Sequence, residues 1–284
     1  MSKFSITVGP EDAGRSVKDV LRRNFSFSSR LMTRFKQNNC ICLNGEPVKV
    51  NVVTSFGDVI DIGLPDEESY FAPEDVPIVP VYEDDDLLII DKPAGYVVHP
   101  TKGHPAHTIA NGLTRYMTDA GKPFKIRFVN RLDMDTTGLL LIAKNAHAQE
   151  EIVKQMHENK IVKKYAAVLC GIVGPDEGVI EAPVGGRPST TRYRVVERYK
   201  RGYTLAELTI QTGRTHQIRV HMSEMGHPVV GDRLYGGEKI WLIERQALHA
   251  HFISFFHPIT GKLIEVSAEM PEDMRKLLTT VSSL

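Results

Sequence analysis

The 284-residue sequence predicts an α+β fold built from two domains. Segments typical of β-hairpins are mixed with helical segments, which favours α+β over a regular βαβ repeat. No period of about 20–50 residues recurs, so a solenoid is excluded. The charge distribution also divides the chain: residues 13–37 are strongly basic, whereas residues 58–91 hold twelve acidic residues and no lysine or arginine.

The bulk composition is typical of a soluble globular protein, with 42% hydrophobic and 25% charged residues. No run approaches the roughly 18 apolar residues of a membrane span, and the N-terminus lacks an apolar signal-peptide core. The three cysteines are an odd, sparse set, which argues against a disulfide framework. We therefore expect a cytoplasmic protein. The net charge of zero gives no support for nucleic-acid binding, but residues 13–37 carry seven basic residues against one acid, Asp19.

Two short amphipathic helices are expected near the N-terminus, the first over residues 15–24 and the second capped by Ser28 and Ser29. Alternating residues then flank Asn44-Gly45, a dipeptide favoured in tight hairpin turns, and residues 57–63 predict a further strand. The module ends near residue 64. Its helices should bury the apolar residues Val17, Val20, Leu21, Leu31, Met32 and Phe35.

The second domain follows a linker over residues 65–80, which contains four prolines and no helical period. Residues 79–100 predict a strand, an acidic turn, a second strand and a turn at Pro93-Ala94-Gly95. A helix within 146–160 should place Ile152, Val153 and Met156 on one face. Further along, the elements expected are a strand at 163–173, two strands around Arg201-Gly202, a turn at Thr212-Gly213 and a helix from about Thr215.

One charged turn stands out within the segment FVNRLDMDTTGLLLIAKN, residues 128–145. Arg131, Asp133 and Asp135 precede Gly138 and an apolar run, residues 139–143, that predicts a core strand. Charges beside a buried segment are costly unless they are paired or used. A salt-bridged turn between Arg131 and Asp133 is the plain structural alternative.

Two kinds of metal site could use this turn, and the histidines of the chain could form a third. A calcium-binding loop starting at Asp133 would place Lys144 at its bidentate-ligand position, which excludes it. Asp133, Asp135 and Thr137 spell the Asp-x-Asp-x-Thr pattern of haloacid-dehalogenase-type phosphatases, yet Asp232 is followed by no second acid for magnesium. The eleven histidines are scattered and form no H-E-x-x-H motif, so we expect no metal.

The charged turn resembles the Arg-Leu-Asp motif of RNA pseudouridine synthases of the ribosomal large-subunit (RluA/RluD) type. Five further segments resemble this family in the same order and spacing over roughly residues 80–270. They are IIDKPAGYVVHP (89–100), KKYAAVLCG (163–171), TGRTHQIRVHM (212–222), and the closing segments GHPVVGDRLYGG and ALHAHFISFFHPITGK. One departure is Asn130, where most relatives have histidine. The family does not use that histidine as its nucleophile, so we expect activity to persist.

The resemblance implies a catalytic domain over 81–284 with a mixed, largely antiparallel sheet and flanking helices. It also implies an isomerase that breaks the uridine N1–C1′ bond and rejoins the base through C5 without any cofactor. A carboxylate is required beside C1′ and C2′, as nucleophile or as base. The catalytic residues implied are Asp133, Tyr165 and Arg219, with Arg219 keeping Asp133 ionised. The substrate-binding residues implied are Arg131, Arg214 and His216.

The N-terminal module, residues 1–64, resembles the S4 RNA-binding domain that often precedes this catalytic domain. Its basic residues should bind RNA phosphates. They are Arg15, Lys18, Arg22, Arg23, Arg30, Arg34 and Lys36. We expect a monomer whose partner is RNA, with ribosomal RNA ahead of transfer RNA and no membrane. The rivals are a metal-dependent phosphatase and a non-catalytic RNA-binding protein.

Overall fold

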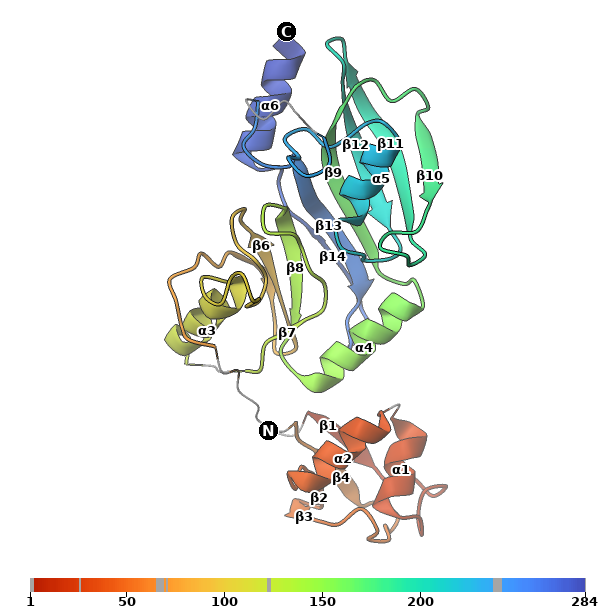
Figure 1. Cartoon of the computed structure of the whole chain (residues 1–284). Coiled ribbons are helices and arrows are strands. Elements are labelled where there is room, and N and C mark those ends of the chain that lie inside the picture. Colours follow the sequence, from red (N-terminus) through yellow and green to blue (C-terminus); the bar gives the residue numbers. More distant parts are fainter. Residues whose placement is uncertain are drawn as a thin grey trace. The chain divides into compact units, whose positions relative to one another are not determined.

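The computed structural model describes residues 3–25, 27–64, 69, 71–121, 124–236 and 242–283. The chain forms two compact units, one of Met1–Glu68 with Asn145–His147, the other of Ser69–Lys144 with Ala148–Leu284 (Figure 1). The domain boundaries expected from the sequence stay a prediction, because residues 65–68 and 70 of the expected linker lie outside the described residues. None of the helices within the described ranges is long and apolar enough to cross a membrane.

The first unit combines two helices with a small antiparallel sheet in the order β1-β4-β2-β3. Both helices start at a serine cap: Ser16 accepts from the Asp19 amide, and Ser28 accepts from the Leu31 amide. The elements are β1 (Phe4–Thr7), α1 (Val17–Asn24), α2 (Ser29–Gln37), β2 (Ile41–Leu43), β3 (Glu46–Pro47) and β4 (Val59–Ile62).

The local predictions for this unit are confirmed. All six apolar residues expected to face inward from α1 and α2 are buried. Asn44 and Gly45 connect β2 to β3 with φ values of 53° and 87°, the left-handed conformation that a tight hairpin turn requires. Helix periodicity and turn chemistry are therefore sufficient to place these elements.

The second unit contains a ten-stranded sheet with the strand order β10-β11-β12-β9-β13-β8-β6-β5, and β14 and β7 pair at its side. All strand pairs are antiparallel except β8 with β13, so the predicted α+β class and largely antiparallel sheet are confirmed. The strands are β5 (Pro80–Glu83), β6 (Leu87–Lys92), β7 (Arg127–Phe128), β8 (Thr137–Ala143), β9 (Val162–Cys170), β10 (Glu177–Glu181), β11 (Thr190–Tyr199), β12 (Tyr203–Ile210), β13 (Leu248–Phe256) and β14 (Leu263–Ser267). The helices are α3 (Ile109–Asp119), α4 (Ala146–His157), α5 (Gln217–Glu224) and α6 (Glu272–Ser283).

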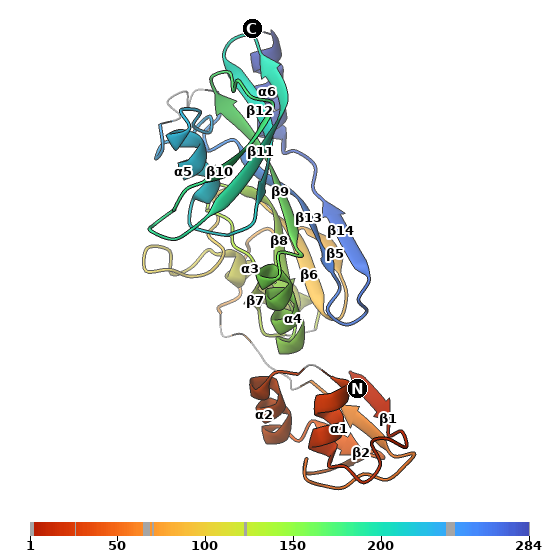
Figure 2. The same ribbon diagram turned by 90° about the vertical axis from the view of Figure 1, so that its right-hand side faces the viewer.

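The continuous apolar runs of β6 and β8 arise because both faces of these strands are covered. Leu88 and Ile90 pack with α3, whereas Leu87 and Ile89 pack in the core that includes α4. The two views show α3 and α4 on opposite sides of β6 and β8 (Figure 1, Figure 2). These two strands thus form a rigid base for the turn that precedes β8.

The inward face of α4 is narrower than the sequence suggests. Ile152 is fully buried and Met156 is half-buried, but the side chain of Val153 is 36% exposed. Val153 follows Ile152 by one residue, about 100° further around the helix, and so leaves the buried stripe. The prediction that Val153 shares one face with Ile152 and Met156 is therefore wrong.

Candidate active site

A cavity of about 510 Å³ opens beside the turn between β7 and β8. Its volume falls within the roughly 300–1,000 Å³ typical of small-molecule sites. It brings together all six residues that the sequence predicted as catalytic or substrate-binding, although they come from three separate stretches of chain. They are Arg131, Asp133, Tyr165, Arg214, His216 and Arg219.

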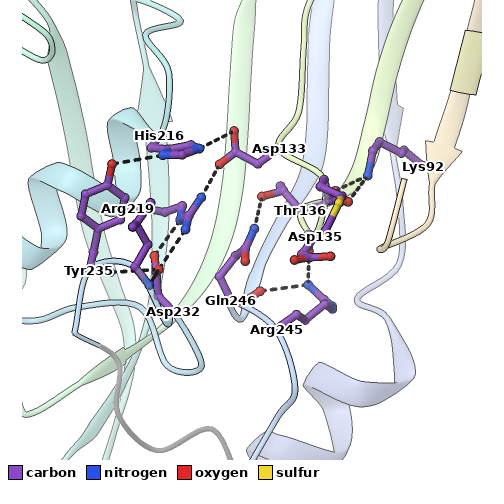
Figure 3. A network of polar contacts seen from close by, with 12 residues as sticks. Lys92, Asp133, Asp135, Thr136, His216, Arg219, Asp232, Tyr235, Arg245 and Gln246 are labelled. Carbon is purple, nitrogen blue, oxygen red and sulfur yellow. Dashed lines mark hydrogen bonds and ion pairs between the residues drawn. The ribbon is translucent and has the colours of Figure 1, made fainter. Parts of the chain in front are cut away.

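The central contact in the cavity joins Arg219 to two carboxylates (Figure 3). Nη1 of Arg219 donates to Oδ2 of Asp133 at 3.0 Å, and Nε and Nη2 donate to both oxygens of Asp232 at 2.6 and 2.9 Å. Burial alone would lower the pKa of Arg219, but the hydrogen bonds to Asp232 and Asp133 outweigh it and raise that pKa. The guanidinium therefore stays charged and holds the Asp133 side chain, which is 23% exposed.

Asp232 is the fixed end of this arrangement. Its side chain is fully buried, and Oδ1 also accepts from the backbone amides of Leu234 and Tyr235 at 3.0 and 3.2 Å. Burial raises its pKa, yet the hydrogen bonds from Arg219 and the two amides lower it overall. Asp232 is thus an ionised anchor that orients Arg219 toward the cavity.

His216 links the second oxygen of Asp133 to the wall of the cavity. Its Nε2 lies 3.8 Å from Oδ1 of Asp133, and its Nδ1 lies 3.1 Å from the Tyr235 hydroxyl. The residue precedes α5 with a φ of 56°, so the helix begins at Gln217 rather than at Thr215. The Tyr235 ring also packs against the Arg219 guanidinium, 5.2 Å from ring centroid to Cζ.

Tyr165 lies on β9, lines the cavity and is 6% exposed. Burial, followed by the nearby negative charge of Asp133, raises the pKa of its hydroxyl. The phenol is therefore neutral at physiological pH and offers an apolar ring beside the carboxylate. Both properties suit a planar base as the bound group.

Arg131 and Arg214 also line the cavity. Arg131 is exposed, and Arg214 is half-buried with its Nε 3.4 Å from the Pro188 carbonyl. Neither forms an ion pair within the described part of the chain. The alternative of a salt bridge between Arg131 and Asp133 is therefore not what the structure contains, because Asp133 pairs with Arg219.

The turn that carries Asp133 is fixed by Lys92 at the end of β6. This side chain is fully buried and donates to the carbonyls of Pro93, Met134 and Thr136 at 2.8, 2.7 and 3.0 Å. Burial lowers its pKa to about 7, against the favourable charges of Asp135 and Asp133. Lys92 thus replaces the backbone partners that a turn of this shape lacks.

A second group of side chains holds the same turn from the β13 side. Arg245 donates to the Asp135 carbonyl at 3.1 Å, and Gln246 donates to the Thr136 hydroxyl at 3.2 Å. The Thr137 hydroxyl lies 2.9 Å from Nδ1 of His249. Asp135 contributes to this bracing through its backbone carbonyl, and the negative charge of its side chain favours the charged form of Lys92.

Gly138 is required where the turn enters β8. Its φ is 110°, and an added Cβ would lie 2.3 Å from the Ala250 carbonyl oxygen. The parallel pairing of β8 with β13 places Thr137 opposite His249 and Gly138 opposite Ala250. The close approach of the two backbones thus depends on the absence of a side chain.

Comparison with known proteins identifies the family of this chain. The model of the RNA pseudouridylate synthase family matches residues 86–224, which contain Asp133, Tyr165 and Arg219. An uncharacterized RNA pseudouridine synthase, YlyB of Bacillus subtilis, is 37% identical over 98% of both chains. The chain belongs to the RNA pseudouridylate synthase family. It is accordingly an isomerase that acts on uridine in RNA.

Other relatives carry a more specific name. The ribosomal large subunit pseudouridine synthase D of Pasteurella multocida is 37% identical, covering 90% of this chain and 87% of that relative. The Escherichia coli protein of the same name is 33% identical over 97% and 93%. Human RNA Pseudouridylate Synthase Domain Containing 4 shares the fold, with a TM-score of 0.59 at 20% identity, covering 72% of this chain and 92% of its own.

The phosphatase alternative fails on the geometry of the synthase site. Magnesium would need Asp232 as a ligand, but both oxygens of Asp232 are bound by Arg219. Across the described residues, the cluster of potential metal ligands is Asp84, Asp86 and His257, whose ligand atoms lie within 4.8 Å of one another. Asp84 is already used there by the Tyr82 hydroxyl, two backbone amides and His257.

Asn130 is explained by its backbone contacts. Its amide Nδ2 donates to the Leu139 carbonyl at 3.2 Å, and its Oδ1 accepts from the Leu141 amide at 2.7 Å. The side chain imitates a peptide group and extends the β7–β8 ladder by one step. Asn130 therefore holds one end of the Asp133 turn, and its role is to position that turn.

The residues that sequence reasoning missed are Lys92, Asp232 as an anchor, Tyr235 and Arg245. Lys92 had a usable signal, because a lysine two residues after the apolar run LLII, at the end of the same predicted strand, must find partners. The sequence indicates Asp232 only as a potential metal ligand. Tyr235 and Arg245 had no local signal, since their partners come from other elements.

The basic residues of the first unit are only partly available for RNA. Asp12 lies just outside the basic segment, is 2% exposed, and pairs with Arg23 at 3.0 Å and with Arg15 at 3.8 Å. Arg22, Arg30 and Lys36 are exposed, whereas Lys18 and Arg34 are half-buried. The binding role of all seven stays a prediction, and the exposed residues are its best candidates.

Proposed function

We propose that this synthase isomerises uridine in large-subunit ribosomal RNA, with transfer RNA as the second candidate, and that Asp133 is its essential carboxylate. The observation that carries the assignment of Asp133 is its ion pair with Arg219, which Asp232 anchors from the buried side. Support for the substrate comes from the relatives named ribosomal large subunit pseudouridine synthase D.

The reaction conserves atoms, so no co-reactant is consumed. The N1–C1′ bond breaks, the base turns, and a C5–C1′ bond forms, while a proton leaves C5 and N1 gains one. Oδ2 of Asp133 is held by Arg219, while Oδ1, 3.8 Å from Nε2 of His216, faces the ribose C1′ and C2′. A fixed cation beside the carboxylate keeps it ionised and oriented at the reacting sugar.

The remaining cavity residues take the roles of holding and exposing the nucleotide. The Tyr165 ring stacks on the uracil once the target has left its RNA helix or loop. Arg131 fills the space that the base vacates, and Arg214 with His216 holds a phosphate near the start of α5. All of these groups belong to this chain, so the proposed reaction uses neither metal nor cofactor.

The first unit would act as an S4-like RNA-binding domain. Its exposed Arg22, Arg30 and Lys36 would add salt-dependent affinity without choosing the sequence. We propose domains at 1–64 and 81–284 joined by a linker at 65–80. Ribosomal RNA as substrate would place the protein in the cytoplasm, where we expect it to act as a monomer.

The test is tritium release from RNA labelled at uridine C5. Wild type, Asp133→Asn and Asp135→Asn are compared with and without EDTA, on unmodified large-subunit ribosomal RNA and on unmodified transfer RNA. Asp135→Asn is the matched control, since Asp135 lies in the same turn and contacts Arg245 through its backbone carbonyl, which the substitution keeps. We expect release from ribosomal RNA that survives EDTA and Asp135→Asn and disappears with Asp133→Asn.

Two outcomes would overturn parts of this proposal. Release from transfer RNA alone would move the substrate assignment to the second candidate. RNA binding without release from either RNA would instead favour a non-catalytic RNA-binding protein, in which the cavity is a scaffold.

A further inference from the structure

The active-site cavity contains a cation that the roles proposed above leave unused, Lys163 on β9. Successive side chains of a strand point to opposite faces, so Lys163 and Tyr165 share one face and Lys164 takes the other. Lys163 and Tyr165 accordingly both line the cavity. The ammonium group of Lys164 instead lies 3.5 Å from Glu207 and 5.4 Å from the Phe252 ring centroid.

Lys163 is half-buried, yet it has no hydrogen-bond or ion-pair partner for its side chain within the described ranges. Burial is the cause that lowers its pKa, with no neighbouring charge acting on it. Withdrawing a cation from water is costly unless an anion compensates. Such a side chain, kept at the wall of a cavity, fits an anionic group supplied by the ligand.

The net charge of the cavity lining also favours an anionic ligand. Its lining residues include one carboxylate, Asp133, and four lysine or arginine side chains, which are Arg131, Lys163, Arg214 and Arg219. Arg219 neutralises Asp133, and Asp232 binds Arg219 from behind. The cations left over are Arg131, Lys163 and Arg214, which together would attract a polyanion rather than a neutral base.

Lys163 also reaches the cavity from a different segment of the chain than Arg131 and Arg214. It enters the cavity with Met156, His157 and Asn159, the residues at and just after the end of α4. Arg214, by contrast, belongs to the segment that leads into α5. A nucleotide in the cavity has a phosphate on each side of its sugar, so two separate cationic positions match two phosphates.

We propose that the Lys163 ammonium binds a backbone phosphate next to the target uridine and so positions the sugar at Asp133. This inference rests on the proposed function and adds one residue to its substrate-binding set. Lys163 touches the RNA backbone rather than the reacting atoms. It should therefore affect substrate binding and its dependence on salt more than the chemical step.

The experiment measures tritium release from C5-labelled large-subunit ribosomal RNA by the full chain at several KCl concentrations. Lys163→Met, Lys163→Gln and Lys163→Arg are compared with Lys164→Met, the neighbour on the opposite face of β9. We expect Lys163→Met and Lys163→Gln to raise KM by about tenfold with little change in kcat. The slope of log kcat/KM against log[KCl] should become shallower by about 0.7–0.9, the value of one phosphate contact.

Lys163→Arg should keep the wild-type slope because it keeps the charge, and Lys164→Met should keep both slope and KM. An unchanged salt slope in both neutral variants would overturn the proposal. A fall in kcat alone would also overturn it, because it would indicate that Lys163 contacts the uracil rather than a phosphate. Thermal unfolding of each variant separates misfolding from lost contacts. Absence of tritium release from the wild type would contradict the proposed function itself, and this outcome is distinguishable from a failure of the Lys163 proposal alone.

Discussion

The buried carboxylate of Asp232 binds Arg219 through two hydrogen bonds of 2.6 and 2.9 Å, and this leaves one arm of the guanidinium to reach the cavity. That arm contacts Asp133 at 3.0 Å. The position of Asp133, the carboxylate we propose as essential, is therefore set by a residue that is not among those lining the cavity. A bidentate pair of this kind fixes direction as well as charge.

Asp232→Asn should abolish most of the tritium release and destabilise the fold. Removing one charge of a buried pair costs about 3–5 kcal/mol, because the partner charge remains buried. We expect kcat to fall about a hundredfold, since Arg219 loses its anchor. Asp176→Asn is the control, because Asp176 is 86% exposed in its pair with Arg198 and should change stability by less than about 1 kcal/mol.

The stability difference between wild type and Asp232→Asn should also depend on pH. Hydrogen bonds from Arg219 outweigh burial and lower the pKa of Asp232 in the folded protein. The contribution is therefore complete above the unfolded pKa of about 3.9 and is lost as the pH falls through the lower folded value. Urea unfolding of both proteins between pH 7 and pH 3 should show the difference narrowing only at the acid end.

Lys92→Met should slow the reaction, because the carbonyls of Met134 and Thr136 lose their shared donor and the Asp133 turn loosens. The pH dependence is the sharper test. Burial lowers the folded pKa of Lys92 to about 7, whereas the unfolded value is about 10.4. The unfolded state thus binds more protons between these values, and wild-type stability should rise with pH there.

The expected rise is at most about 1.4 kcal/mol per pH unit relative to Lys92→Met, measured by urea unfolding between pH 7 and pH 9.5. Below pH 7 the two proteins should keep a constant difference. Lys102→Met, at an exposed lysine, should follow the wild-type curve. Parallel curves for wild type and Lys92→Met would show that Lys92 does not titrate in this range.

Asn130→His should retain activity, whereas Asn130→Ala should lose stability. The alanine leaves the Leu139 carbonyl and the Leu141 amide without their side-chain partner, which costs about 1–3 kcal/mol. Histidine can replace one of these two contacts and is the residue that most relatives carry in the resemblance. Thermal unfolding and tritium release on the same preparations check both. Equal stability of wild type and Asn130→Ala would contradict the bridging role.

The paired variant Arg30→Gln with Lys36→Gln should weaken RNA binding by the full chain and reduce its salt dependence. Both residues are exposed, and each lost phosphate contact should lower the slope of log Kd against log[KCl] by about 0.7–0.9. Arg23→Gln should have a smaller effect, because Arg23 already pairs with Asp12. Filter binding with ribosomal RNA measures both. Equal slopes in all proteins would remove this surface from the RNA-binding site.

The sequence by itself was sufficient wherever the cause of a structure is local. Caps and periodicity placed α1 and α2, and Asn44-Gly45 placed its hairpin, because each depends on neighbours within a few residues. The motif at Asp133 marked the site for a similar reason. A charged turn before a buried strand is visible in the chain, and its spacing to other motifs indicated the family.

Only the tertiary structure decided which groups hold that site in place. Arg219 and Asp133 are 86 residues apart, and Lys92 reaches carbonyls 42 and 44 residues away. The Lys92 contacts exist because sheet register places the end of β6 beside the start of β8, and the Arg219 contact exists because α5 lies next to the turn that carries Asp133. For the same reason the exposure of Val153, and the absence of a partner for Lys163 among the residues that the structure describes, follow from what surrounds each side chain. The residues adjacent in sequence do not determine either.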